Sequence, residues 1–253
     1  MKIGIILIGY NMEEYVQPCL RAWTDARGMR LGGHEFIICA VSLPFLGFPD
    51  AKEDGTRSML CDLEGMGYID NVIESPRNIP ETVARGMALS WLKDRGITHT
   101  IQVDLDEFYT EADILNIFSF VEVNPFIVAY RLSLKNLVFD EHTYLAEPFM
   151  PMRIHRIDSL SSCIATSFWD DNNVLYEGAI TGAKVKDIEM ANMTIPPSVA
   201  FVRHASWLSN DRSRRKVEYQ LARGWTPSFL WDDSKGLIFN PALPAPKILS
   251  DSP

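Results

Sequence analysis

Paired cysteines, long apolar runs and an excess of positive charge are all missing from this chain of 253 residues. Cys19, Cys39, Cys61 and Cys163 form no Cys-x-x-Cys pair, which excludes a zinc ribbon, and a chain of this length needs no disulfide framework. No apolar run approaches the ~18 residues of a membrane span. The N-terminal run MKIGIILIGYN is too short for a signal peptide and has no cleavage-like site. We therefore expect a cytoplasmic protein with reduced thiols and no membrane span.

The net charge of −9 limits the classes of partner that this protein can bind. A general nucleic-acid binder needs Lys and Arg over a broad face to neutralise phosphates, so the charge argues against that class and leaves only a local basic groove. Hydrophobic residues make up 47% of the chain and charged residues 23%, which is typical of a globular protein with a substantial core.

Alternating strand and helix patterns organise the first 105 residues. Apolar or alternating runs predict strands at 2–8, 34–43, 68–75 and 98–105. Helical spacing predicts helices at 12–26 and 80–96, the second with Pro80 at its start and Gly96 at its end. The order β-α-β-β-α-β predicts an α/β fold with a mostly parallel, Rossmann-like sheet and flanking helices in a single domain.

The second half has a more α+β character. We expect a helix at 111–123, and strands within 126–139, 151–157 and 200–208. A helix at 209–223 begins with the basic residues Arg212, Arg214, Arg215 and Lys216, at a helix terminus that already favours anions. The proline-rich tail at 241–253 is expected to be extended or partly disordered.

A run of carboxylates stands at the end of the fourth predicted strand, in IQVDLDEFYT at 101–110. No Lys or Arg occurs between Arg95 and Arg131, so water, a distant arginine or a metal ion must answer this charge. Asp104 and Asp106 lie two apart, so their side chains face the same way, roughly 6.5–7 Å apart. This spacing suits a site where one carboxylate binds Mg²⁺ or Mn²⁺ and the other binds a water or a ribose hydroxyl. The alternative is that these acids cap the following helix and meet water; Glu107 receives no role.

Further polar side chains follow the other strands, where ligands bind to open α/β sheets. They are Tyr10 and Asn11 after the first strand, Ser42 at the second and Arg77 after the third. His204, on a strand just before the basic helix, is either a ligand of Mn²⁺ beside the carboxylates or a histidine of the core.

Over residues 1 to 225 the chain resembles the family 2 glycosyltransferases, which have the glycosyltransferase A fold. The motifs that carry the resemblance are YNMEEYVQPCLRAW after the first strand, the Asp-x-Asp of the fourth, MRIHR, and VRHASWLSNDRSRRKVEYQLARG. The resemblance implies a nucleotide-sugar-binding half at 1–110 and an acceptor-binding half at 111–240.

The resemblance also implies roles for single residues. Asp106 would bind the metal, and Asp104 the ribose or a metal-bound water. Tyr10, Asn11 and Arg77 would line the nucleotide pocket. His204 would bind the metal or the diphosphate, and the helix around Arg214 would help to hold the phosphates.

The chain departs from the family at Ser42, where an acidic residue usually reads the ribose or the base; Asp50, Glu53 and Asp54 are possible substitutes. An inverting transferase needs a general base for the acceptor hydroxyl. We expect Asp171 or Asp170, after Trp169 in SFWDDNNVLYEG, with Glu177 as second choice; the alternative is an exposed polar loop.

The function predicted from these features is a metal-dependent glycosyltransferase of the inverting kind, using a nucleotide-diphosphate sugar and a hydroxyl-bearing acceptor. A saccharide is the preferred acceptor, with a modified nucleic acid or a protein as alternatives. A sugar-nucleotide nucleotidyltransferase would carry a Gly-rich, basic loop after the first strand, and LIGYNMEEY has none. A non-catalytic nucleotide- or carbohydrate-binding protein is the third hypothesis. The sequence gives no oligomeric state.

Overall fold

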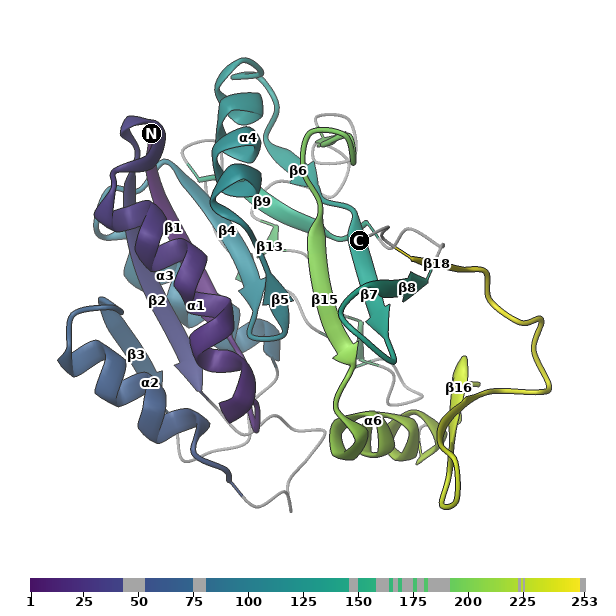
Figure 1. Cartoon of the computed structure of the whole chain (residues 1–253). Coiled ribbons are helices and arrows are strands. Elements are labelled where there is room, and N and C mark those ends of the chain that lie inside the picture. Colours follow the sequence, from purple (N-terminus) through teal and green to yellow (C-terminus); the bar gives the residue numbers. More distant parts are fainter. Residues whose placement is uncertain are drawn as a thin grey trace.

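The computed structural model describes residues 1–42, 53–74, 81–145, 150–157, 192–222, 224 and 226–250, with four two-residue strands between 164 and 181. A seven-stranded sheet forms the centre of the molecule, with helices on both faces (Figure 1). The predicted α/β fold class is confirmed by this arrangement.

Four parallel strands make up one side of the sheet in the order β3-β2-β1-β4. They are β1 (Lys2–Ile8), β2 (Glu35–Ser42), β3 (Asn71–Glu74) and β4 (His99–Asp104). The chain leaves β1 towards β2 on one side and later returns to β4 on the other. The topological switch point, where ligands bind in open α/β sheets, therefore lies between β1 and β4.

The sheet continues beyond β4 with three strands from the second half of the chain, β9 (Met152–Arg156), β6 (Ala129–Arg131) and β14 (Asn192–Thr194). β9 is antiparallel to both of its neighbours, β4 and β6. Both halves of the chain thus contribute to one sheet.

The helices α1 (Glu13–Gly28), α2 (Thr56–Gly65) and α4 (Glu111–Glu122) cover one face, and α3 (Glu81–Lys93) covers the other (Figure 1). The predicted stripe of Tyr15, Cys19 and Trp23 on α1 is buried, although Pro18 lies inside the helix. Trp23 packs against the rings of Phe36 and Tyr109.

The predicted order β-α-β-β-α-β lacks one helix, because α2 stands between β2 and β3. TRSMLCDLEG is half polar and its apolar periodicity is weak. This helix could have been inferred from the topology, since two adjacent parallel strands need a crossover connection, which is usually a helix.

A second sheet has the order β18-β8-β7-β15-β5. Its strands are β18 (Ile248–Ser250), β8 (Thr143–Leu145), β7 (Leu134–Val138), β15 (Val202–Trp207) and β5 (Glu107–Phe108). The two-residue β5 follows β4 almost directly and pairs with β15. It therefore links the segment 104–107, here called the acidic turn, to the second half of the chain.

β15 leads into α6 (Asn210–Ala222), which is the basic helix (Figure 1). A hairpin of β16 (Phe229–Asp232) and β17 (Gly236–Phe239) packs against it. β18 lies within the proline-rich tail and pairs with β8. Among the described residues, no helix is long and apolar enough to cross a membrane.

Candidate active site

The acidic turn lies at the carboxyl ends of β1 and β4, where Ile8 and Asp104 are partners in the parallel register. The two strand ends approach closely at Gly9, where an added Cβ would come within 2.7 Å of Cγ and 2.8 Å of Cβ of Leu105. Sγ of Cys19, on α1, lies 3.7 Å from the carbonyl oxygen of Asp104. Packing on both sides therefore fixes the backbone from which the carboxylates project.

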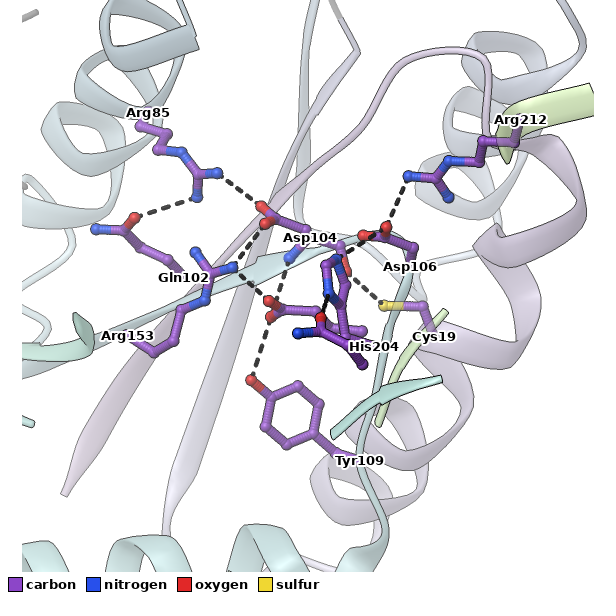
Figure 2. Close-up of polar contacts among 11 residues, drawn as sticks. Cys19, Arg85, Gln102, Asp104, Asp106, Tyr109, Arg153, His204 and Arg212 are labelled. Atoms are coloured by element: carbon purple, nitrogen blue, oxygen red, sulfur yellow. Dashed lines mark hydrogen bonds and ion pairs between the residues drawn. The ribbon is translucent and has the colours of Figure 1, made fainter. Parts of the chain in front are cut away.

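Asp104 lies between two arginines from different elements (Figure 2). Nη2 of Arg85, on α3, lies 2.6 Å from one carboxylate oxygen, and Nη2 of Arg153, on β9, lies 2.7 Å from the other. Arg85 also donates to the side-chain oxygen of Gln102 at 3.1 Å. Burial opposes ionisation of Asp104, but the charges of Arg153 and Arg85 outweigh it and lower the pKa of this carboxyl.

Glu107 is completely buried beneath Asp104. It accepts hydrogen bonds from the guanidinium of Arg153 and, at 3.4 Å, from the hydroxyl of Tyr109. Burial raises the pKa of Glu107 to about 7, against the opposing charge of Arg153. Arg153 is thus shared between two carboxylates and holds them together.

The expectation that Asp104 and Asp106 face the same way is wrong, because β4 ends at Asp104 and the strand alternation does not extend to Asp106. Asp106 points to the other side of the turn, towards the second sheet (Figure 2). Its Oδ2 lies 2.6 Å from Nη2 of Arg212 and 3.1 Å from Nε2 of His204. The side chain of Asp106 is 4% exposed. Burial opposes its ionisation, but the charges of His204 and Arg212 outweigh this effect, so the pKa of Asp106 lies well below its usual value.

Two strand pairings hold His204 in place. In the register of β15 it stands opposite Glu107 of β5 on one side and Asn136 of β7 on the other. Nδ1 of His204 lies 2.6 Å from Oδ1 of Asn136. With Nδ1–H donating to this oxygen, the ring presents Nε2 towards Asp106.

The alternative reading of the acids as a helix cap is wrong. Thr110 and Asp113 form the capping box of α4. Asp106 and Glu107 are buried rather than meeting water. Cationic side chains inside the protein balance their negative charge.

The basic helix contributes Arg212 to the carboxylates, whereas Arg214 is exposed and pairs with Glu218 at 3.0 Å. Lys216, one turn after Arg212, lies over the ring of Trp207, with Nζ 4.4 Å from its centroid. Burial lowers the pKa of Lys216 to about 8, although Asp106 acts to raise it. The structure thus places Arg212, rather than Arg214, beside the acidic residues, and the predicted contact of this helix with phosphates stays a prediction.

Asn11 lines a cavity of about 670 Å³ between the first turns of α1 and α6. Its backbone has a φ of +54°, and its Oδ1 accepts a hydrogen bond from the backbone N–H of Asp54 at 3.1 Å. The other residues that line the cavity are Glu13, Glu14, Gln17, Pro18, Asp54, Met59, Ser209, Asp211 and Arg215. Asp54, a suggested substitute for the missing acid of the second strand, thus lies beside Asn11.

Ser42 is buried at the end of β2, in register with Glu74 of β3. Tyr10 is half-buried, and burial raises the pKa of its hydroxyl. Arg77, Asp170, Asp171 and Glu177 lie outside the described residues, so their predicted roles stay predictions.

The arginines that form ion pairs with these carboxylates come from distant parts of the chain, namely Arg85, Arg153 and Arg212. The sequence alone gave no role at these carboxylates to Arg85, Arg153 or Asn136, and it expected Arg212 near them only as one residue of the basic helix. One signal was available for Arg85, which interrupts the apolar stripe of α3 formed by Ala84, Ala88, Leu89 and Leu92.

Asp106 and His204 fit a divalent cation as adjacent ligands. Two neighbouring ligands of an octahedral ion, each about 2.1 Å from the metal, lie about 3 Å apart. The Oδ2–Nε2 distance of 3.1 Å matches this spacing. The hydrogen bond from Nδ1 to Asn136 is the outer contact typical of a metal-binding histidine. No group of three acidic, histidine or cysteine ligands occurs among the described residues, so phosphates and water would complete the shell.

No protein-family model and no curated protein matches the chain. Among solved structures the chain is similar to Staphylococcus aureus TarS 1–349, with 15% identity and a TM-score of 0.50, over 88% of this chain and 64% of that chain. It is similar to the same protein in complex with UDP-GlcNAc, with 15% identity and a TM-score of 0.52, over 88% and 65%. The chain thus spans somewhat less than two thirds of the TarS chains that it matches. This likeness shows that the chain shares its fold with TarS.

Proposed function

We propose that this protein is a metal-dependent, inverting glycosyltransferase that moves a sugar from a nucleotide-diphosphate donor to a hydroxyl-bearing acceptor. The observation that carries the proposal is the pair Asp104 and Asp106 at the carboxyl end of β4, beside the switch point of the sheet. The contact of Asp106 with both His204 and Arg212 adds to it. The shared fold supports it as well, because TarS is a glycosyltransferase that has been crystallised with UDP-GlcNAc.

Charge divides the proposed donor site into two parts. The cavity beside Asn11 is lined by four carboxylates and one arginine, which suits ribose hydroxyls or base N–H groups better than phosphates. Arg212 and Lys216 supply positive charge near Asp106, where the diphosphate would lie. In this proposal Arg212 takes the phosphate-binding role that the sequence suggested for Arg214.

Asp104 would accept a hydrogen bond from the ribose or from an ordered water. Arg85 and Arg153 hold its carboxylate in one orientation, and its side chain is still 23% exposed. A carboxylate that is kept ionised and fixed in this way is a suitable hydrogen-bond acceptor.

Asp106 and His204 would hold Mn²⁺ or Mg²⁺. When bound, the ion neutralises negative charge that develops on the leaving diphosphate. Arg212 and Lys216 would neutralise the remaining phosphate charge from α6, and Asn136 would keep His204 in the required orientation.

The acceptor side of the proposal rests on the sequence. A general base must take the proton of the acceptor hydroxyl, and Asp171, Asp170 and Glu177 are the candidates. The preferred acceptor is a saccharide, with a modified nucleic acid or a protein hydroxyl as alternatives. Asn variants of Asp170 and Asp171, and a Gln variant of Glu177, tested singly, would identify the base by a loss of turnover that donor binding does not share.

The first experiment measures the melting temperature with UDP, GDP and CDP, each with and without Mn²⁺, followed by turnover of UDP-GlcNAc. We expect stabilisation by one nucleotide to increase with the metal. Asp106→Asn should lower turnover about 100-fold or more, because it removes a proposed metal ligand, and should leave the circular dichroism spectrum unchanged.

Asp62→Asn is the matched control, because it removes the same charge from an exposed position on α2. It should retain full turnover. Unchanged activity of Asp106→Asn would refute its role, and the absence of metal-dependent stabilisation by any nucleotide would refute the donor site. Nucleotide binding without turnover of any donor would indicate a binding protein instead.

A further inference from the structure

Arg212 occupies the carboxylate oxygen that the proposed function assigns to a metal ion. Its Nη2 lies 2.6 Å from Oδ2 of Asp106, and the same oxygen lies 3.1 Å from Nε2 of His204. Two cations that share one carboxylate oxygen repel each other strongly in a buried site. A metal between Asp106 and His204 therefore competes with this guanidinium.

Asp106 cannot remain without a cation. It is 2% exposed, and a buried carboxylate that loses its partner is strongly destabilising. Arg212 stands in the first turn of α6, where the helix dipole disfavours positive charge. Its position is therefore explained by its contact with Asp106 rather than by helix stability.

The same guanidinium has unused capacity for an anion. Nη1 of Arg212 is buried and has no hydrogen-bond partner in the part of the chain that the structure describes. The guanidinium also lies over the ring of Tyr15, with Cζ 5.1 Å from the ring centroid. Guanidinium groups bind phosphates through two parallel N–H donors. A diphosphate beside Asp106 would offer oxygens to both terminal nitrogens.

We propose that Arg212 is a resident counter-cation, which neutralises Asp106 in the ligand-free protein and moves to the diphosphate when a metal and a nucleotide bind. The inference rests on the proposed function, since it names the partner that releases Arg212. Its consequence is that the metal binds weakly alone and tightly with a nucleoside diphosphate, because the diphosphate removes the competing cation.

The test is a titration of the full chain with Mn²⁺, followed by the electron paramagnetic resonance signal of free Mn²⁺, with and without UDP. In the wild type, UDP should raise the affinity for Mn²⁺ about tenfold or more. Arg212→Gln should bind Mn²⁺ alone about tenfold more tightly than the wild type, and UDP should then add less. A residue that merely supports the fold would not increase metal affinity when it is removed.

Arg214→Gln is the matched control, because it removes the same charge from the same helix at a side chain that pairs with Glu218. It should behave like the wild type, and Arg212→Lys, which keeps the charge, should still bind Mn²⁺ weakly without UDP. Equal gains in Arg212→Gln and Arg214→Gln would overturn the proposal in favour of a net-charge effect. Unchanged or weaker binding of Mn²⁺ by Arg212→Gln would also overturn it.

The outcomes separate this inference from the proposed function. If no nucleotide binds to the wild type or to any variant, the proposed function fails. In that case, Arg212→Gln binding Mn²⁺ more tightly than the wild type, without nucleotide, would still support Arg212 as the counter-cation of Asp106. If Arg212→Gln does not fold, the titration of the wild type with Mn²⁺ still tests the proposal. If UDP leaves the affinity of the wild type for Mn²⁺ unchanged, the proposed coupling is overturned.

Discussion

Replacing His155 by glutamine should remove part of the acid sensitivity of this protein. His155 lies on β9, is 1% exposed and stands opposite Thr100 in the register. Neither ring nitrogen has a hydrogen-bond partner among the described residues. Burial, helped by the nearby charge of Arg153, lowers the pKa of His155 from 6.5 to about 4.

The direction of the effect follows from proton binding. The folded state keeps His155 neutral, whereas the unfolded chain takes up a proton below about pH 6.5. Above pH 6.5 His155 is neutral in both the folded and the unfolded state, so it does not lower the free energy of unfolding. As the pH is lowered from 6.5 towards 4, only the unfolded state gains the proton, and the free energy of unfolding falls. The loss is about 1.4 kcal/mol per pH unit in this window, or about 2 kcal/mol between pH 7 and pH 5.

The assay is urea denaturation of the wild type and His155→Gln at about pH 7 and about pH 5, followed by tryptophan fluorescence and circular dichroism. Other titrating groups cancel in the difference between the two proteins. The wild type should lose about 2 kcal/mol more than the variant on acidification. His142→Gln, at an exposed position, is the control and should follow the wild type. Equal losses in wild type and His155→Gln would refute the argument that burial keeps this imidazole neutral.

Two further substitutions test the packing of the acidic turn. Arg153→Met should lower the free energy of unfolding by about 3 kcal/mol, because Asp104 and Glu107 lose a shared buried partner. In urea denaturation, the double variant with Glu107→Gln should recover part of this loss. Strictly additive losses from the two substitutions would contradict the shared pairing. Gly9→Ala should cost about 1–3 kcal/mol, because its Cβ would overlap Cβ of Leu105, which no rotamer change can relieve. Gly28→Ala is its control, since a Cβ there meets nothing within 4 Å, and equal melting temperatures for the two variants would refute the overlap.

Six of the seven strands of the central sheet were predictable, because each combines a short apolar run with flanking residues that end a strand; β14 was not predicted. β1, β2 and β4 have nearly the predicted bounds, and the stripe on α1 identified its buried face in spite of Pro18. α2 was missed because its stabilisation comes from packing on α1 and the sheet rather than from its own periodicity. The two-residue β5 was missed because a strand of that length has no period to detect.

The candidate site was predictable where chemistry depends on sequence neighbours and unpredictable where it depends on contacts across the sheet. The sequence singled out Asp104, Asp106 and His204, and the structure brings His204 to Asp106; their proposed roles stay predictions. The spacing of the two aspartates placed both side chains on one face, which the turn after β4 prevents. The choice between Arg212 and Arg214 depends on the rotation of α6 relative to Asp106, which the helix sequence does not contain. Asn136 and His204 meet only because β7 and β15 are neighbours in the second sheet.

The pattern of charges also carries information that could be used before a structure exists. A buried run of carboxylates requires cations, and arginines at positions that are otherwise apolar are the candidates. Arg85 interrupts the apolar stripe of α3, and Arg153 alternates with the core residue Ile154 in MRIHR. Each is costly to bury alone, and the acidic turn is the partner that makes its burial possible. Compensation of Asp104 and Glu107 by Arg85 and Arg153 needs no ligand, whereas Asp106 depends on Arg212, the one of these three arginines that belongs to the basic helix. The proposed metal site therefore concerns Asp106 and His204, and neither Asp104 nor Glu107 needs a metal ion to balance its charge.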